Sequence, residues 1–412
     1  MSLITPVTTK IPERSPHPPA WRWARLTEVA KLESGHTPSR KNPEYWGGAV
    51  LWLSLKDMQR LAGRYVLDTV DKPTMLGIEN SSARLLPAGT VALCRTASVG
   101  KVAILGREMA TSQDFVDWVC GPQLDPEYLY WALSCSSAAF DVEKQGSTHK
   151  TIYMPTLERL NVLLPPLDEQ HRIAALLDKA DAIRRKRQEA IALTEQLLRS
   201  TFLEMFGDPF INPKRWALAP LHELATIGSG VMKGRDYTGI ETIELPYMRV
   251  ANVQDGYLAL NDIKSITLPI ADVEKYTLRY GDILLTEGGD PDKLGRGAVW
   301  RDQIASCVHQ NHIFRVHPDR KRITSEYLCA LLGSSHGKRY FLRAAKQTTG
   351  IATINRTQLS EFPVLLPPLE LQIDYSRFVA AHERLTQRYH QLIAEQDTLF
   401  QSLVQRAFSG QL

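Results

Sequence analysis

Basic, amide and hydroxyl side chains gather in a few turn-rich loops of this 412-residue sequence, in positions suited to contact a polyanion. Arginine and lysine pair with phosphate or with guanine, and asparagine and glutamine match the adenine edge. In residues 21–166 the candidates are Thr37, Ser39, Arg40, Lys41, Ser54, Lys56, Asp57, Arg95, Thr96, Ser98 and Lys101. In residues 207–366 they are Lys233, Arg235, Arg249, Asn252, Gln254, Arg296, Gln310 and Asn311. Each alone is as consistent with an ordinary surface or cap residue, so their recurrence in two blocks is what favours nucleic-acid contact.

Motifs that would give the chain chemistry of its own are missing from the sequence. No GxxxxGK[ST] phosphate loop occurs, and no glycine-rich dinucleotide turn follows an expected strand. The two Leu-Pro-Pro-Leu segments lack the polar and aromatic residues with which an amino-methyltransferase holds its target base. Asp290 to Lys293 is better explained as a turn than as a nuclease metal site, and His309 and His312 as a strand-edge polar pair than as ligands. The sequence therefore predicts no catalytic residue, cofactor or metal in this chain.

Composition and charge are those of a protein of two or three domains without a membrane span. Five scattered cysteines without a CxxC pair indicate a reducing compartment, which predicts the cytoplasm. Residues 1–166 carry 18 basic and 16 acidic side chains (+2), and residues 207–366 carry 20 and 17 (+3). Residues 167–206 carry 7 of each, and residues 367–412 carry 4 and 5. This distribution permits nucleic-acid binding without requiring it. Residues 1–20, with five prolines, are predicted to be a disordered tail.

A continuous helix of about 60 Å is predicted over residues 167–206, from about forty residues at roughly 1.5 Å each. Two prolines precede it, Asp168 is the expected N-cap, and Gly207 begins the stop signal. Its expected apolar stripe consists of Ile173, Leu176, Leu177, Ala180, Ile183, Ala190, Ile191, Thr194, Leu197, Leu198, Phe202 and Met205. The basic run at residues 184–187 has acids nearby. It is expected to be solvated or acid-paired, with contact to DNA phosphate or an acidic partner as the alternative.

A second long helix with an apolar stripe is predicted at residues 367–412, and it also follows a Leu-Pro-Pro-Leu segment. The chain therefore contains an internal duplication. Residues 364–369 and Gln372 match residues 162–167 and Gln170 one for one. The stripe of the second helix is Ile373, Phe378, Val379, Leu385, Tyr389, Leu392, Leu399, Phe400, Leu403 and Phe408. Because a helix this long with an apolar stripe needs a partner, the two helices are expected to pair, antiparallel to each other.

The blocks that precede the two helices also repeat each other. Residues 50–55 are expected to form a buried strand, residues 90–94 and 101–105 two strands across a turn, and residues 124–140 a helix entered at Asp125. Gly35 recurs as Gly230, the strand after Gly89 recurs after Gly281, and PEYL at 126–129 recurs as SEYL at 325–328. The polar loops differ almost everywhere, as expected for two domains that recognise two different ligands.

Several segments together carry a resemblance to a known family. They are GHTPS (35–39) with Tyr45-Trp46, LPYMRVANVQDGYL (245–258), VHQNHIFRV (308–316), both LLPPL segments, and EQHRIAALLDKADAIRRKRQEAI (169–191) leading to FGDP. In these segments the chain resembles the specificity subunits of type I restriction-modification systems. The second copy departs from the first at Leu371, which stands where the first copy has Glu169.

The resemblance implies an α+β chain of two tandem α/β target-recognition domains, 21–166 and 207–366. Two long antiparallel helices, 167–206 and 367–412, would separate them as a coiled coil with a pseudo-two-fold repeat. Each domain would read half of a split site in double-stranded DNA. The helices would set the spacing and dock two methyltransferase (modification) subunits, and through them restriction subunits. S-adenosylmethionine, ATP and Mg²⁺ would serve the partners only. The rival hypothesis is a duplicated scaffold that binds two proteins and no DNA.

Overall fold

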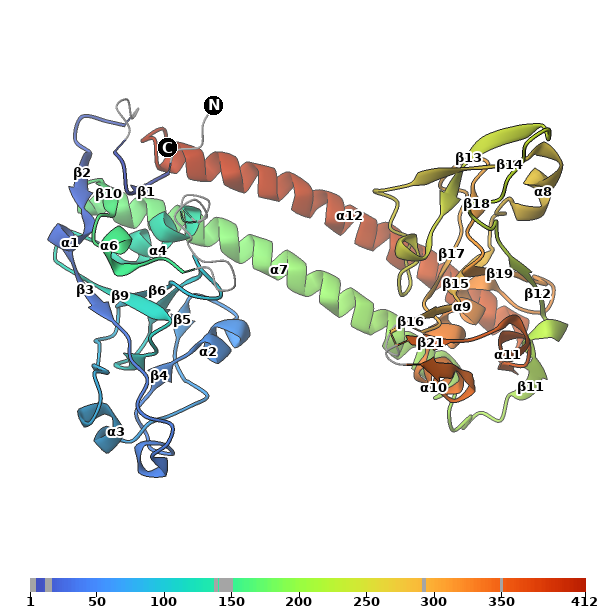
Figure 1. Ribbon diagram of the computed structural model, residues 1–412, viewed down its shortest axis with the longest axis horizontal. Coiled ribbons are helices and arrows are strands. Elements are labelled where there is room, and N and C mark those ends of the chain that lie inside the picture. Colours follow the sequence, from blue (N-terminus) through green and yellow to red (C-terminus); the bar gives the residue numbers. More distant parts are fainter. Residues whose placement is uncertain (1–4, 12–16, 137–139, 141–150, 291–293, 349–350) are drawn as a thin grey trace. The chain divides into compact units, whose positions relative to one another are not determined.

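The computed structural model describes residues 5–11, 17–136, 140, 151–290, 294–348 and 351–412. The chain folds into two compact units (Figure 1). The first unit contains residues 1–188 and 391–412, and the second contains residues 189–390. Each unit thus combines one of the repeated blocks with part of each long helix. The fold class is the predicted one, with two mixed α/β domains in tandem and two long helices.

The two long helices are α7 (Leu167–Phe206) and α12 (Leu369–Ala407). The prediction that Asp168 caps α7 is wrong, because the carbonyl of Pro166 already accepts from the amides of Glu169 and Gln170, at 3.0 Å each. Asp168 therefore lies in the first helical turn, where its charge still favours the positive end of the helix dipole. Gly207 follows the last helical residue with φ of +78°, a left-handed conformation that glycine adopts without strain.

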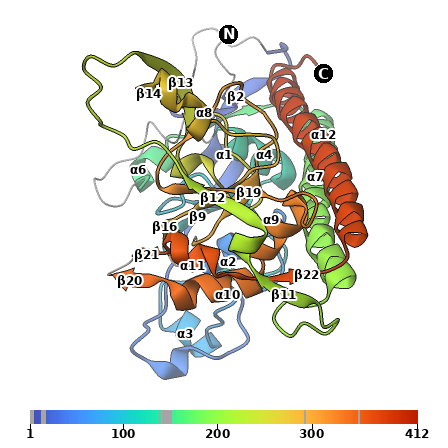
Figure 2. The same ribbon diagram turned by 90° about the vertical axis from the view of Figure 1, so that its right-hand side faces the viewer.

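Within each unit α7 and α12 pack against each other, and they lie side by side in Figure 2. In the first unit Arg187 Nη1 donates to the carbonyl of Leu392 at 3.2 Å and to Gln396 Oε1 at 2.8 Å. In the second unit His382 Nε2 lies 3.0 Å from the carbonyl of Thr194. The first half of α7 thus meets the second half of α12, and the reverse holds in the other unit. The pairing is antiparallel, as predicted.

The apolar seam between the helices is narrower than the predicted stripe. Ile183 and Leu197 of α7 are about half exposed, and Leu399 of α12 is 69% exposed. Ile373 and Leu385 are also exposed. A single partner helix covers only a narrow seam of a helical surface, so stripe positions beyond that seam remain in solvent. Burial is complete only at the helix ends, as at Ile173 and Phe206, where a domain also packs against them.

The first unit is built on a five-stranded sheet, with strand order β3-β9-β6-β7-β5, in which only the β7–β5 pair is parallel. Its strands are β3 (Ala30–Ser34), β9 (Phe115–Cys120), β6 (Val91–Cys94), β7 (Val102–Leu105) and β5 (Tyr65–Val66). Smaller sheets are formed by β1 (Val7–Thr8), β10 (Asn161–Leu164) and β2 (Arg22–Arg25), and by β4 (Trp52–Leu53) with β8 (Ala110–Thr111). Its short helices are α1 (Leu26–Val29), η1 (Pro43–Tyr45), α2 (Leu55–Arg60), α3 (Met75–Glu79), α4 (Pro126–Cys135) and α6 (Met154–Leu157).

The second unit repeats this plan around a four-stranded antiparallel sheet, β12-β19-β15-β17. Its strands are β12 (Ala225–Ser229), β19 (Ile313–Pro318), β15 (Ile283–Thr286) and β17 (Gly297–Val299). Smaller sheets contain β11 (Ala217–Pro220) and β22 (Pro363–Leu366); β13 (Thr242–Met248), β14 (Lys264–Pro269) and β18 (Val308–His309); and β16 (Gly288–Gly289), β20 (Lys346–Thr348) and β21 (Ile351–Thr353). Its short helices are η2 (Leu221–Glu223), η3 (Val250–Asn252), η4 (Ile270–Asp272), α8 (Val273–Tyr276), α9 (Ser325–Gly333), α10 (Ser335–Ala344) and α11 (Arg356–Ser360).

A buried glutamine joins each block to its following helix. Gln170 Oε1 accepts from the amide of Asp125, at the start of α4, while its Nε2 donates to the carbonyls of Pro165 (2.8 Å) and Gln123 (3.0 Å). Gln372 makes the corresponding bonds to the amide of Thr324, at the start of α9, and to the carbonyl of Pro367. Both glutamines are fully buried. The repeated Leu-Pro-Pro-Leu sequence with its following glutamine therefore encodes the joint between domain and helix.

Three local predictions differ from the structure. Residues 1–20 were expected to be a disordered tail, but β1 pairs with β10, and Val7 is fully buried with its amide donating to Ser136 Oγ. The strand expected at residues 50–55 shrinks to β4, because Ser54 already caps α2. The helix entered at Asp125 ends at Cys135 rather than at Phe140, and residues 137–139 lie outside the described part.

Candidate nucleic-acid interface

Arg40 and Lys56 meet at one carboxylate of the first unit. Arg40 Nη2 donates to Asp71 Oδ2 at 2.7 Å, and Lys56 Nζ lies 3.2 Å from the same oxygen. The Arg40 guanidinium stacks 3.5 Å from the ring centroid of Trp46, which packs edge-on against Trp52. The hydrogen bond from Arg40 is the main cause that holds the pKa of Asp71 below its ordinary value. Both cations remain at least half exposed, so the cluster presents a net positive charge.

A second cluster of the first unit surrounds Gln113, just before β9. Thr37 Oγ1 donates to Gln113 Oε1, and Arg95 Nε donates to the Gln113 carbonyl at 3.1 Å. Thr96 Oγ1 donates to the neighbouring Asp114. The loops that follow β3 and β6 therefore meet the turn before β9. Of the other candidates in these loops, Ser39, Lys41 and Lys101 are exposed and Ser98 is partly buried.

In the second unit the candidates pair in other ways. Arg249 Nη2 donates to the carbonyl and to Oδ2 of Asp262, both at 2.7 Å. Arg296 Nη1 donates to Gln254 Oε1 at 3.0 Å. The loop between β12 and β13 carries two exposed candidates, Lys233 and Arg235. The structure therefore brings Gln254 and Arg296 together. Arg249 already uses Nη2 of its guanidinium in hydrogen bonds to Asp262.

A polar chain that the sequence did not reveal lies before β19. His312 Nδ1 is 2.9 Å from Glu287 Oε2, and His312 Nε2 is 3.4 Å from Nδ2 of the candidate Asn311. The candidate Gln310 lies beside them, half buried, and its amide donates to a strand carbonyl. The side chains of His312 and Glu287 are 59% and 32% exposed, so this row of hydrogen-bonded side chains is accessible to solvent. The sequence predicted His312 and His309 to be a strand-edge polar pair rather than ligands, and the acid that contacts His312 became visible only in the structure.

Four of the candidate residues are caps of short helices. Ser54 and Asp57 form a capping box at α2, in which Asp57 Oδ2 accepts from the amide and hydroxyl of Ser54. The other Asp57 oxygen accepts from the amide of Val70. At η3 the amide of Arg249 donates to Asn252 Oδ1 at 2.9 Å, and Asn252 is buried. Ser54, Asp57 and Asn252 thus have structural roles, and the backbone of Arg249 shares one.

Close backbone approach explains why a glycine opens the equivalent loop of each unit. A Cβ on Gly35 would lie 2.0 Å from the carbonyl oxygen of Ser112, and one on Gly230 would lie 2.0 Å from that of His309. Any side chain at either position would force the two segments apart. The glycines therefore hold the loop after β3, or after β12, against the turn that carries Gln113 or Asn311.

Asp117 and His309 are fully buried, and desolvation is the main cause that shifts their pKa values. Burial raises the pKa of Asp117 to about 7, although the hydroxyl of Thr111 donates to it at 2.6 Å and lowers it. Burial lowers the pKa of His309 to about 4, and the nearby Arg315 acts in the same direction. Both groups therefore favour their neutral forms inside the fold.

The basic run of α7 is acid-paired, in agreement with the favoured prediction. Arg184 and Arg185 both contact Asp181, at 3.3 Å and 3.0 Å, and Arg184 lies 3.8 Å from Asp397 of α12. Arg187 bonds to α12 as described above. Arg184 and Arg187 thus link α7 to α12, whereas Lys186 of the same run is exposed.

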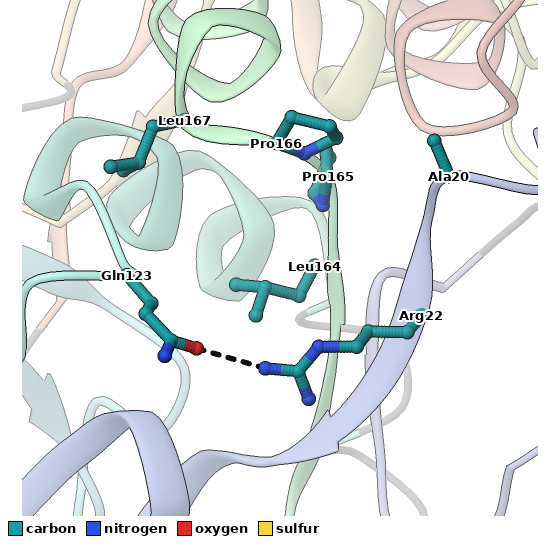
Figure 3. Close-up of a pocket in the computed structure, with 7 residues that line it drawn as sticks. All are labelled: Ala20, Arg22, Gln123, Leu164, Pro165, Pro166 and Leu167. Atoms are coloured by element: carbon teal, nitrogen blue, oxygen red, sulfur yellow. Dashed lines mark hydrogen bonds between the residues drawn. The ribbon is translucent and has the colours of Figure 1, made fainter.

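Two hollows of the surface are lined by none of the candidate residues. One of about 240 Å³ lies at the start of α7, where Arg22 Nη2 donates to Gln123 Oε1 at 2.9 Å (Figure 3). Its lining residues are Ala20, Arg22, Gln123, Leu164, Pro165, Pro166 and Leu167. In the described part of the chain no group of three or more potential metal ligands gathers. Most of the Asp290–Lys293 turn lies outside the described residues.

Sequence comparison places most of the chain in one family of domains. A family profile described as type I restriction modification DNA specificity domain matches residues 18–193 and 213–395. The type I restriction enzyme MjaIX specificity subunit of Methanocaldococcus jannaschii is 25% identical over 296 residues, 68% of each chain. The type I restriction enzyme EcoKI specificity subunit of Escherichia coli is 23% identical over 290 residues, 65% of this chain and 61% of that one.

Solved structures show the same fold over nearly the whole chain. A structure from work on complex assembly and conformational transition of a type I restriction-modification system has a TM-score of 0.59 at 21% identity. The match covers 96% of this chain and 99% of that one. The type I restriction-modification S subunit from M. genitalium has a TM-score of 0.54 at 14% identity, covering 97% of this chain and 98% of that one.

Proposed function

Because the chain belongs to the family of type I restriction-modification DNA specificity domains, we propose that it selects the DNA sequence on which such a complex acts. Each of its two domains reads one half of a bipartite site in double-stranded DNA. The observation that carries this proposal is the duplicated scaffold with unlike polar surfaces. Gln170 and Gln372 join the domains to their helices in the same way, while the clusters at Gln113 and Asn311 differ in charge and in hydrogen-bonding groups.

We propose as domain boundaries residues 21–166 and 207–366 for the two readers, and 167–206 and 367–412 for the helices. Strand β1 lies before the first of these boundaries, but it pairs with β10 of the first reader. The helices set the spacing of the half-sites and dock two modification subunits, through which restriction subunits join. The half-exposed apolar positions Ile183 and Leu197 support a docking role, because they would be covered by a partner.

The chain itself is proposed to be non-catalytic, with S-adenosylmethionine, ATP and Mg²⁺ used by its partners. Among the described residues no helix has the length and apolarity needed to cross a membrane. Since the DNA that the chain would recognise is chromosomal or incoming DNA, the proposed location is the cytoplasm.

Salt-dependent binding to duplex DNA tests the proposal. For the chain assembled with its modification subunits, the logarithm of the binding constant should fall linearly with the logarithm of salt concentration, because phosphate contacts release counterions. Lys101→Gln and Lys233→Gln, which remove exposed cations from the first and second unit, should each reduce the slope by about 1. Arg159→Gln, a loss of an exposed cation elsewhere on the first unit, should leave the slope unchanged.

Salt-independent association, or none, would contradict DNA recognition. If the assembled chain then still bound two proteins through its domains, the duplicated protein-binding scaffold would be the better explanation.

A further inference from the structure

Arg95 and Glu287 occupy the same backbone position in the two units. Each is the residue that directly follows the central strand β6 or β15. The amide of Arg95 donates to the carbonyl of Asp114 at 2.8 Å, and that of Glu287 donates to the carbonyl of His312 at 3.1 Å. Their own carbonyls accept from Ile152 and from the equivalent Ile354, at 3.0 Å and 2.9 Å. The duplicated scaffold thus holds two side chains of opposite charge at one place.

In the first unit this place offers hydrogen-bond donors. Arg95 is held by a single nitrogen, Nε, which donates to the carbonyl of Gln113. Its terminal Nη groups are the ones that can reach a ligand. The hydroxyl of Thr37 donates to Gln113 Oε1, which orients that amide, and the NH₂ group of Gln113 is a second donor at this place.

In the second unit the same place offers an acceptor. Asn311 Nδ2 donates to His312 Nε2, so the proton of a neutral imidazole lies on Nδ1, which then donates to Glu287 Oε2. These bonds orient the carboxylate and leave Oε1 of Glu287 as an acceptor, on a side chain that is 32% exposed.

A position that holds Glu287 cannot face the DNA backbone, because a carboxylate there would be repelled by phosphate. It can face a base edge that carries a donor, and in the major groove the N4 amino group of cytosine is such a donor. The equivalent position of the first unit then also faces a base edge. Arginine there matches the O6 and N7 acceptors of guanine.

Resting on the proposed function, we propose that Arg95 and Glu287 are specificity-determining residues. Arg95 selects a guanine in the half-site of the first domain, and Glu287, oriented by His312, selects a cytosine in the half-site of the second. One scaffold position therefore distinguishes the two half-sites by exchanging a donor for an acceptor.

Methylome sequencing of cells that carry the chain with its modification subunit tests this. Arg95→Gln should relax one guanine of one half-site, and Glu287→Gln one cytosine of the other half-site. Each should lose roughly 5- to 150-fold discrimination at that base, the range expected for one good side-chain–base pair. Arg159→Gln and Glu274→Gln are the matched controls, since Arg159 is exposed and the Glu274 side chain is 93% exposed. Neither control should change the motif.

Conservative variants keep the test independent of folding. Arg95→Lys keeps the charge but loses the planar fork, and Glu287→Asp shortens the carboxylate. With the modification subunit present, both variants should still support DNA methylation while relaxing the same bases as the glutamine variants. Weaker methylation of all sites with unchanged base preference would overturn the inference, as would relaxation at an adenine or in the wrong half-site. A wild-type methylome without any bipartite motif would instead refute the proposed function.

Discussion

Replacing Gln170 by methionine should destabilise the first unit at its joint with α7. Methionine has nearly the same shape but can make none of the three hydrogen bonds of the buried amide, to Asp125, Pro165 and Gln123. A buried polar group left without a partner costs about 1–3 kcal/mol. At the lower end of that range, three such groups correspond to about 3 kcal/mol.

The equivalent Gln372→Met in the second unit should cost less. Gln372 bonds to two backbone groups, the amide of Thr324 and the carbonyl of Pro367. The expected loss is therefore about 2 kcal/mol, two thirds of that at Gln170. Gln188→Met, at an exposed position of the same helix as Gln170, is the control and should change stability by less than about 0.5 kcal/mol.

Hydrogen exchange of the full-length chain can assign each loss to its own unit. Gln170→Met should reduce protection in α4 and β10 while leaving α9 and β22 unchanged, and Gln372→Met should do the opposite. Equal effects on both units, or effects no larger than that of Gln188→Met, would refute the account of the Leu-Pro-Pro-Leu joint.

Three further predictions concern pH, an ion pair and the helices. Asp117 has a pKa raised to about 7 and His309 one lowered to about 4. As the pH falls from 7 to 4, protonation of Asp117 should therefore stabilise its unit. The effect of His309 is opposite: it destabilises its own unit progressively below pH 6.5, by about 3 kcal/mol in all when the pH reaches 4. Exchange corrected for intrinsic rates should show these opposite trends, and parallel trends would contradict them. Arg64 makes a bidentate contact with Asp178 of α7, a carboxylate that is about one quarter exposed. Arg64→Ala should therefore weaken the exchange protection of α7 by about 1 kcal/mol. Unchanged protection of α7 would refute this. Four-residue insertions beside Thr194 and His382 should lengthen the spacer of the methylated motif by one or two base pairs, because four residues add roughly 6 Å with little rotation. Two-residue insertions should abolish methylation. An active four-residue variant with the old spacer would contradict the proposal that the helices set the spacing.

Local and periodic features of the chain could be predicted from sequence. The paired prolines marked where both long helices begin, and Gly207 ended α7 where expected. The joint made by Gln170 and Gln372 was not predicted; the sequence showed only that the two glutamines correspond in the repeat. The width of the buried seam could not be predicted, because periodicity identifies a stripe without showing how much of it one partner helix covers. Leu197 is exposed for this reason.

The candidate site was predicted less completely. Recurrence in both blocks was taken to favour DNA contact, yet at Asp57 and Asn252 it reflects a shared capping geometry. Asp71 and Glu287 were missed, because their partners Arg40 and His312 are distant in sequence. Only folding brings such partners together, so the orienting residues are the part that sequence reasoning could not reach.

Exchange of one reader tests the central proposal most directly. Residues 21–160 of this chain would be replaced by the same block of a relative that recognises a different sequence, and the methylome would be determined with the cognate modification subunit present. If each domain reads its own half-site, one half of the bipartite motif changes to that of the donor while the other half and the spacer stay as they were. If the exchanged chain supports methylation by the modification subunit but both halves of the motif change together, or neither changes, the two-reader account is contradicted.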